Sequence, residues 1–226
     1  MEASAPPGRV RARLWDAPTR VVHWALAALI GFSWWAAEND RMQWHRLSGY
    51  SVLGLLVFRL LWGFAGSQSA QFASFVKGPK ATLDYARSLG KRAYVATAGH
   101  NPLGALSVLA ILLALVAQVT TGLFAVDVDG LESGPLSDRV SFDVGREFAE
   151  WHERSFTALQ MLVVLHVAAI VFYAVSKRID LVRPMVTGQQ IFPADPQLRF
   201  APLWRAALVA LVAIAVAWFV AKGLRL

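Results

Sequence analysis

The sequence contains no cysteine. This excludes disulfide bonds, iron–sulfur clusters held by thiolates, and haem attached covalently as in c-type cytochromes. Charged residues are also few, at 16% of the 226 residues, against about a quarter in soluble domains. Apolar residues make up 56% of the chain, and the mean hydropathy is +0.46. The composition therefore indicates an integral membrane protein rather than a soluble one.

The net charge is +7, and the isoelectric point is near 10.2. A basic balance of this size is also typical of proteins that bind nucleic acid. Here, however, the basic residues lie in short stretches between long apolar runs, which is the distribution found in loops that flank membrane spans. We therefore expect a lipid bilayer as a partner of this chain, and no nucleic acid.

Five segments approach or reach the roughly 20 apolar residues that a helix needs to cross a bilayer. In lipid the backbone must satisfy its own hydrogen bonds, so long unbroken apolar runs predict helices. The five predicted spans are residues 21–37, 44–64, 103–125, 148–175 and 203–221. Between the second and third spans, residues 80–89 predict a short interfacial helix. Asn101-Pro102 is a typical helix start, with Asn as the cap and Pro in the first turn.

These segments predict an all-α integral membrane protein with four parts. Residues 1–20 form a polar N-terminal segment, and residues 21–176 carry the first four spans. Residues 177–202 form a linker that contains several prolines, and residues 203–226 form the fifth span with a short tail.

The residues that flank the predicted spans indicate an orientation. Thirteen Lys and Arg residues lie in the N-terminal segment and in the second and fourth loops, against five on the opposite side, whose main loop is acidic. Because basic loops stay in the cytoplasm, the N-terminus is predicted to be cytoplasmic and the C-terminus to lie outside. Most of the nine tryptophans fall near span ends, which predicts an aromatic belt at the two membrane interfaces.

Four of the five histidines, His23, His45, His152 and His166, lie within the predicted spans or one turn from their ends. Ionisable side chains are costly in lipid, so each is a candidate functional residue. His152 and His166 are fourteen residues apart on the fourth predicted helix, which corresponds to roughly 21 Å along its axis. Fourteen steps of about 100° return to within about 40° of the starting direction, so both side chains are predicted to face one side, one in each leaflet.

Each of these two histidines has a candidate partner at its own depth. His23 opens the first helix on the cytoplasmic side and can meet His166, whereas His45 opens the second helix on the outer side and can meet His152. Two such pairs on facing helices predict two haem groups, each with two axial imidazoles, and iron ligated in this way suits electron transfer. For any single histidine, helix packing is an equally good explanation. A zinc site is less favoured, because zinc takes three or four ligands around one point.

Two further residues are candidates for the inner side of the membrane. Arg59 follows His45 by fourteen residues, which places it at the predicted depth of the His23–His166 pair. A buried guanidinium needs an anion, and a haem propionate or a quinone oxygen would serve, although snorkelling to the interface also explains Arg59. His100 precedes the third span; it is either a plain interfacial histidine or a hydrogen-bond partner and proton acceptor at a quinone site.

A family resemblance covers roughly residues 10–190. It is carried by the motifs WDAPTRVVHW (residues 15–24), WHRLSGY (44–50), FRLLWGFAG (58–66), GHNPLG (99–104) and LHVAAIVFYAVSKRIDLVRPMVTG (165–188). In this order they resemble the bacterial di-haem cytochrome b membrane family, which includes the cytochrome b subunit of nickel–iron hydrogenases.

The resemblance implies a four-helix transmembrane haem-binding bundle in the bacterial inner membrane, with two b haems. The implied axial ligands come from the first, second and fourth helices, and are His23, His45, His152 and His166. It also implies electron exchange between the quinone pool and a periplasmic redox protein such as a hydrogenase or a c-type cytochrome. The fifth span departs from the family pattern, and we expect it to be either a partner-docking helix or an anchor.

Three functions are compatible with the sequence. The leading one is an electron-transfer subunit that moves electrons across the membrane between quinone and an outer-side partner. The second is a stand-alone enzyme that oxidises superoxide at the outer haem and reduces quinone; it is less favoured because the acidic outer loop repels an anion. The third is a non-redox membrane anchor or assembly subunit. Because the chain has no nucleotide motif and no thiolate metal site, a subunit of an oxidoreductase complex is preferred to a self-sufficient enzyme.

Overall fold

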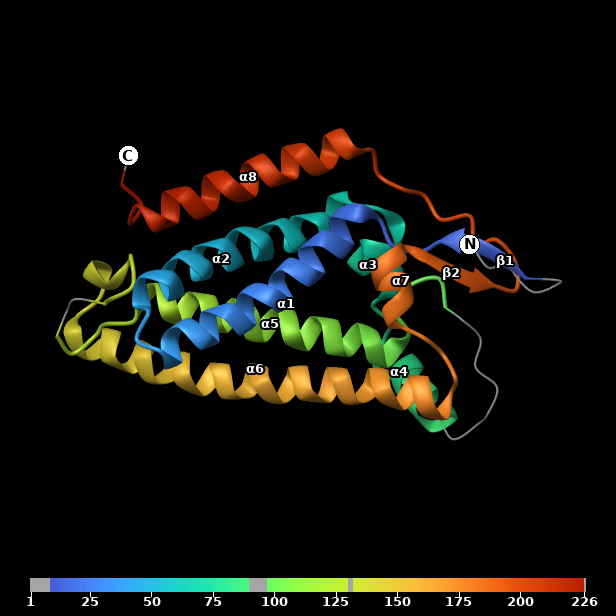
Figure 1. The fold of residues 1–226 in the computed structure, drawn as a ribbon, viewed down its shortest axis with the longest axis horizontal. Coiled ribbons are helices and arrows are strands. Elements are labelled where there is room, and N and C mark those ends of the chain that lie inside the picture. Colours follow the sequence, from blue (N-terminus) through green and yellow to red (C-terminus); the bar gives the residue numbers. More distant parts are fainter. Residues whose placement is uncertain (1–8, 90–96, 130–131, 226) are drawn as a thin grey trace. The chain divides into compact units, whose positions relative to one another are not determined.

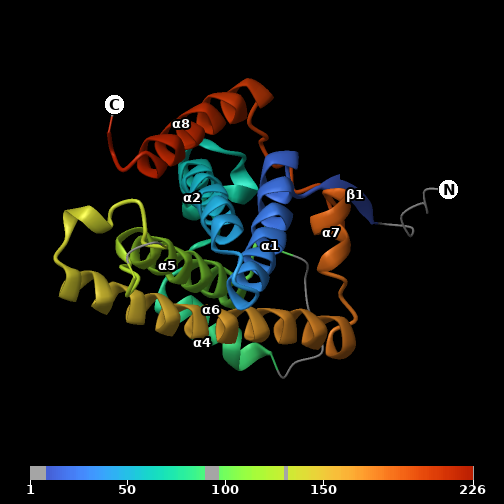
Figure 2. The same cartoon turned by 60° about the vertical axis from the view of Figure 1, so that its left-hand side comes forward.

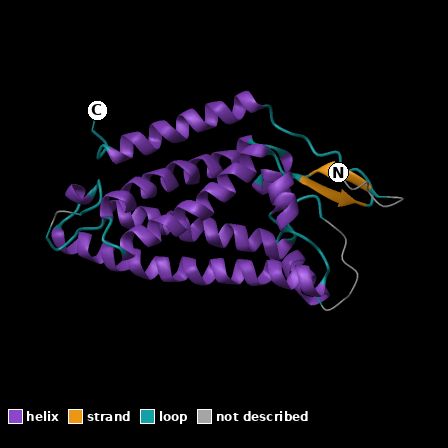
Figure 3. Cartoon of the chain, viewed as in Figure 1, coloured by secondary structure: helices purple, strands orange, loops and turns teal. Residues whose placement is uncertain are grey.

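A computed structural model describes residues 9–89, 97–129 and 132–225 of the chain. Within these residues the protein is mainly helical (Figure 3), and five helices are long and apolar enough to cross a membrane. They are α1 (Ala17–Glu38), α2 (Met42–Ala65), α5 (Pro102–Phe124), α6 (Phe142–Ser176) and α8 (Leu203–Ala221). The prediction of an all-α integral membrane protein with five spans is therefore confirmed.

The predicted spans follow the apolar stretches, and helices α1, α2 and α6 continue beyond them at both ends. The largest difference is in α6, which has 35 residues and begins six residues before the predicted span at residue 148. About 20 residues suffice to cross a bilayer. The additional first turns are rich in polar residues such as Asp143 and Glu147, which form helix without adding to the apolar run.

Shorter elements connect the long helices. They are β1 (Val10–Arg13), α3 (Phe72–Phe75), α4 (Pro79–Ser88), α7 (Val182–Thr187) and β2 (Gln189–Phe192). Helix α4 confirms the short helix predicted at residues 80–89, with Gly78 as its cap and Pro79 in its first turn. The predicted start of α5 is also correct, because Oδ1 of Asn101 accepts a hydrogen bond from the Gly104 N–H at 2.8 Å.

The chain divides into two compact units. Figure 1 labels the helices and strands and colours them by their position in the sequence. Unit 1 consists of Met1–Val21, Leu61–Leu109 and Val164–Ala206. Unit 2 consists of Val22–Leu60, Ala110–Val163 and Ala207–Leu226.

Unit 1 contains the two-stranded sheet. Strands β1 and β2 pair antiparallel, with Val10 opposite Phe192 and Arg13 opposite Gln189. Phe192 packs with Leu14 and Trp15 in a small buried core next to the sheet. These strands were not predicted from the sequence. Each has only four residues, and although β1 alternates apolar and polar side chains, so short a run is weak evidence for a strand.

Unit 2 contains α1 from Val22 to its end, the first part of α2, α5 from Ala110 to its end, the start of α6 and most of α8. Within it, α8 runs beside α2, as the two views in Figures 1 and 2 agree. The two helices approach closely at Gly54, where a Cβ would lie 3.4 Å from the Cβ of Ala217. Small residues let the two backbones approach, as is common between membrane helices.

Candidate functional site

His45 and His152 meet in unit 2, on α2 and α6. The centres of their imidazole rings are 6.0 Å apart, and the ring planes are nearly perpendicular, at 89°. Two imidazoles that share one metal ion have metal–nitrogen bonds of about 2 Å each, and their ring centres then lie roughly 6 Å apart. The predicted pair is therefore brought together at a separation that suits two axial ligands of one iron.

Hydrogen bonds fix which nitrogen of each ring is available. Nδ1 of His45 lies 2.9 Å from the Ser33 carbonyl oxygen, and Nδ1 of His152 lies 2.9 Å from the Gln118 carbonyl oxygen. A carbonyl only accepts, so each Nδ1 carries the proton and donates it. Each neutral ring then keeps its lone pair on Nε2, which is the nitrogen that a metal ion requires.

The same two histidines line a cavity of about 350 Å³. Helices α1, α2, α5 and α6 all contribute walls, together with residues of the loop that follows α5. The lining is largely apolar and includes Ile30, Val52, Leu115 and Leu159. A mainly apolar cavity with two oriented imidazoles is the environment in which helix bundles hold a flat, apolar cofactor such as haem.

Gln118 of α5 is the main residue of this cavity that sequence reasoning missed. Its Nε2 lies 3.1 Å from Nε2 of His152, and its Oε1 accepts a hydrogen bond from the Ser155 hydroxyl. An iron–Nε2 bond at His152 would take the place of the amide contact, so the Gln118 side chain has to turn as the metal binds. A signal was present in the sequence, since Gln118 is a single amide within a long apolar span.

Two glycines leave room at the same site. A Cβ at Gly122 would lie only 2.7 Å from Cε1 of His152, so glycine is required there for the ring to keep its place. Gly49 lines the cavity and has no atom within 4 Å of the position of a Cβ. The residues present at this site fit a haem b, which His45 and His152 would ligate.

The second predicted pair falls in different units, with His23 in unit 2 and His166 in unit 1, and its pairing stays a prediction. Both side chains are half-buried. The Ser107 hydroxyl lies 3.5 Å from Nδ1 of His166. Arg59, in unit 2, is buried with 8% of its surface exposed, so its side chain does not reach out to solvent.

His100 lies in unit 1 between two aromatic rings. The Trp15 ring centre is 4.8 Å from its imidazole and the Phe75 ring centre is 4.7 Å away, both tilted. Next to it, Asn101 caps α5 and donates from Nδ2 to the Tyr173 hydroxyl at 3.2 Å. His100 is therefore fixed by its neighbours rather than being a mobile surface histidine.

The comparison with protein families identifies the class to which the chain belongs. A family model described as prokaryotic cytochrome b561 matches residues 14–188, which is more than half of the chain. The chain belongs to the prokaryotic cytochrome b561 family. It is thus a multi-pass membrane protein of the b-type cytochrome class, with haem b as its cofactor and electron transfer as its general role. No curated protein and no solved structure gave a significant match.

The two ends of the region shared with the cytochrome b561 family meet in unit 1. The N–H groups of Leu14 and Trp15 donate to the Gly188 carbonyl at 2.8 and 3.2 Å. Gly188 ends α7 with a φ of +81°, and a Cβ there would lie 2.9 Å from the Trp15 carbonyl oxygen. Glycine is needed at this position for both reasons.

Asp16 fixes the start of α1 in this family motif. Its Oδ1 accepts a hydrogen bond from the Thr19 N–H at 2.7 Å, and its Oδ2 accepts one from the Trp62 indole at 3.1 Å. Trp62 and Trp15 are buried, with 1% and 6% of their surfaces exposed, so these two pack inside the protein rather than on its surface. The other seven tryptophans are exposed.

We expect the substitution Asp16→Ala to lower the free energy of unfolding by about 2 to 4 kcal/mol, because it removes a helix cap and leaves the buried Trp62 indole without its acceptor. Chemical unfolding in detergent, followed by circular dichroism, measures this loss. The control is Asp84→Ala on α4, where the exposed carboxylate only pairs with Arg87 at 3.9 Å. Equal losses in the two variants would contradict the role of Asp16.

Proposed function

We propose that this cytochrome carries two haem b groups and moves electrons across the bacterial inner membrane. The exchange is between the quinone pool and a periplasmic redox partner, such as a hydrogenase or a c-type cytochrome. His45 and His152 hold the outer haem, and His23 and His166 hold the inner one. When bound, each haem supplies one-electron redox chemistry.

The observation that carries this proposal is the geometry of His45 and His152. Both rings offer Nε2 to one cavity, since both Nδ1 atoms donate to backbone carbonyls. The ring centres of the two imidazoles lie 6.0 Å apart, so His45 and His152 would both be able to ligate one iron. A site of this kind leaves no position for a substrate on the metal, which favours electron transfer over substrate chemistry.

His100 and Arg59 are the residues that we assign to the inner side. The aromatic rings around His100 hold it at a fixed place, where its imidazole would exchange a proton with a quinone. Arg59 is a buried cation that would balance a haem propionate or a quinone oxygen. Arg59 and the His23–His166 pair are predicted to lie at one depth in the membrane, which supports this assignment.

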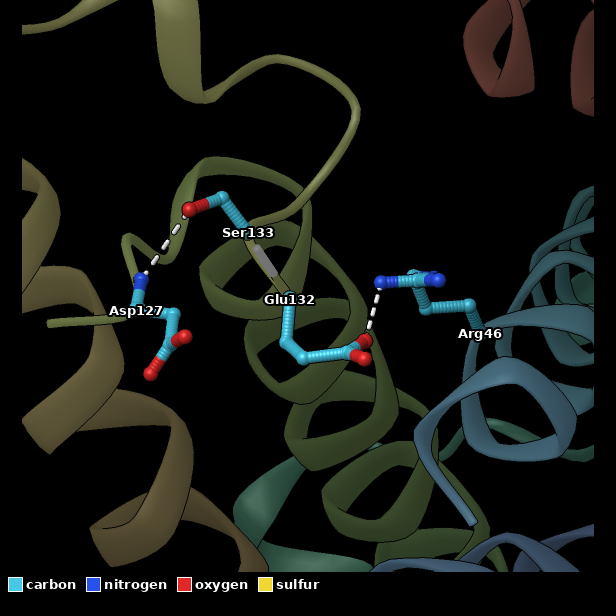
Figure 4. Close-up of polar contacts among 4 residues, drawn as sticks. All are labelled: Arg46, Asp127, Glu132 and Ser133. Atoms are coloured by element: carbon cyan, nitrogen blue, oxygen red, sulfur yellow. Dashed lines mark hydrogen bonds and ion pairs between the residues drawn. The ribbon is translucent and has the colours of Figure 1, made fainter. Parts of the chain in front are cut away.

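The charge around the outer cavity favours a cationic protein partner over superoxide. Glu38, Glu132 and Glu153 line the cavity, against Arg46 as its basic residue. Arg46 is already paired with Glu132, as Figure 4 shows, and both side chains lie partly exposed. An acidic entrance repels a small anion and attracts a basic surface.

We expect a quinol added to the oxidised, purified protein to reduce its haems, and His100→Ala to slow this reduction about tenfold or more through the loss of a proton acceptor. Stopped-flow absorbance at the haem bands measures both. Arg87→Ala, on the exposed face of α4, is the control and should keep the original rate. No reduction by quinol at any rate would overturn the proposal, and rapid reduction by superoxide alone would favour the superoxide-oxidising enzyme.

A further inference from the structure

Helix α8 lies outside residues 14–188, the region shared with the cytochrome b561 family. Its C-terminal end nevertheless makes several contacts within unit 2. Arg139 donates a hydrogen bond from Nη2 to the Gly223 carbonyl at 3.0 Å, and Arg225 forms an ion pair with Asp138. These contacts join the end of α8 to the loop between α5 and α6.

Gly223 is the residue that makes the approach close. It has a φ of +70°, and its N–H donates to the Val220 carbonyl at 2.9 Å, which ends the helix. A Cβ at Gly223 would lie 3.0 Å from the Pro135 carbonyl oxygen. A side chain at Gly223 would strain the left-handed turn and would also crowd the Pro135 carbonyl, so glycine is favoured for both reasons.

The same loop segment, residues 132–139, is held at two other places. The Gly134 N–H donates to the Ala125 carbonyl at 2.8 Å, and the Leu136 N–H donates to the Leu123 carbonyl at 2.9 Å. Glu132 pairs with Arg46 of α2, as drawn in Figure 4. The segment is thus attached to α5, to α2 and to α8.

This segment also forms part of the cavity wall. Glu132, Gly134 and Pro135 line the cavity that contains His45 and His152. Pro135 therefore has the cavity on one side and the Gly223 turn close to its carbonyl. If the C-terminal end of α8 moved away, residues 132–139 would lose their attachment to α8 and keep those to α5 and α2.

We propose that α8 acts as a clasp: its C-terminal turn at Gly223 holds residues 132–139 against the cavity and shields the His45–His152 site from water. The positioning residues are Gly223 and Arg225 on α8, and Asp138 and Arg139 on the loop. The ion pair is exposed, with 71% and 45% of the two side chains accessible, so it contributes less than the backbone contacts.

The clasp is expected to affect the midpoint potential of the haem at His45 and His152, an expectation that rests on the proposed function. Ferric haem with two neutral imidazoles carries one more positive charge than the ferrous form. Water stabilises the more charged form, so opening the wall lowers the midpoint potential of the haem held by His45 and His152. The haem predicted at His23 and His166 keeps its potential.

The test compares the double variant Gly223→Val with Arg139→Ala to the unchanged full-length protein in detergent. Hydrogen–deuterium exchange of residues 132–139 is expected to rise about tenfold, while exchange of residues 102–109 in unit 1 stays the same. Lys222→Ala is the control, since this neighbouring side chain is exposed, and it should leave both regions unchanged. The loop-side variant Arg139→Gln with Asp138→Asn repeats the test if the first variant fails to fold.

Unchanged exchange of residues 132–139 in the variant that folds would overturn the clasp. A redox titration separates the two proposals. A drop in one midpoint potential together with faster exchange supports both, and an unchanged pair of potentials with faster exchange overturns the shielding of the haem. A protein that binds no haem at His45 and His152 would overturn the proposed function, whereas the exchange experiment would still decide whether α8 holds the loop.

Discussion

Replacing His45 by alanine is expected to leave the protein with one haem b instead of two. The substitution removes one of the two imidazoles whose Nε2 atoms are directed to the same cavity, and methyl cannot ligate iron. His152 alone would offer one of the two axial bonds, so the haem would be held more weakly and is expected to dissociate during purification. The haem content, measured as pyridine haemochrome per protein, should fall by about half.

The other histidines provide the controls for this result. His152→Ala should give the same loss as His45→Ala, and a double variant should lose no more than either. His23→Ala should remove the other haem, so that its difference spectrum is complementary. His100→Ala should retain both haems. Full haem content in both the His45 and the His152 variants would contradict the assigned ligands.

Gly122→Ala is expected to have nearly the same effect as removal of a ligand, although it adds only one methyl group. The new Cβ would lie 2.7 Å from Cε1 and 2.9 Å from Nδ1 of His152. The ring cannot retreat without losing the hydrogen bond from Nδ1 to the Gln118 carbonyl. Overpacking of this kind costs about 1 to 3 kcal/mol, which is enough to displace His152 from its position as a ligand.

The matched control is Gly31→Ala on α1. A Cβ at Gly31 meets no atom within 4 Å, and alanine favours a helix more than glycine does. The haem content and the difference spectrum should stay as in the unchanged protein for Gly31→Ala, whereas the signal of the outer haem should weaken or disappear for Gly122→Ala. If the two variants bind haem equally well, Gly122 is not needed for the position of His152.

The long helices could be predicted from the sequence because they depend on local information. Apolar runs of sufficient length identified all five, and Asn101-Pro102 marked the start of α5. The pairing of His45 with His152 was also accessible, because helical periodicity and the depth of each residue in the membrane follow from position along a helix.

The remaining features depend on contacts between distant parts of the chain. Two examples join segments that are far apart in sequence. The Gly188 carbonyl accepts hydrogen bonds from the N–H groups of Leu14 and Trp15, and the Gly223 turn lies beside Pro135. The periodicity of apolar residues along the sequence does not predict such contacts. The role of Asp16 was hidden for the same reason, since its partner Trp62 lies on another helix and resembled an interfacial tryptophan in sequence.

The stoichiometry and spin state of the iron test the central claim most directly. Purified full-length protein should contain two haem b per chain, and its electron paramagnetic resonance spectrum in the oxidised state should show only low-spin ferric iron, as two axial imidazoles on each iron require. One haem per chain, or a predominant high-spin signal, would contradict the account of two bis-histidine sites.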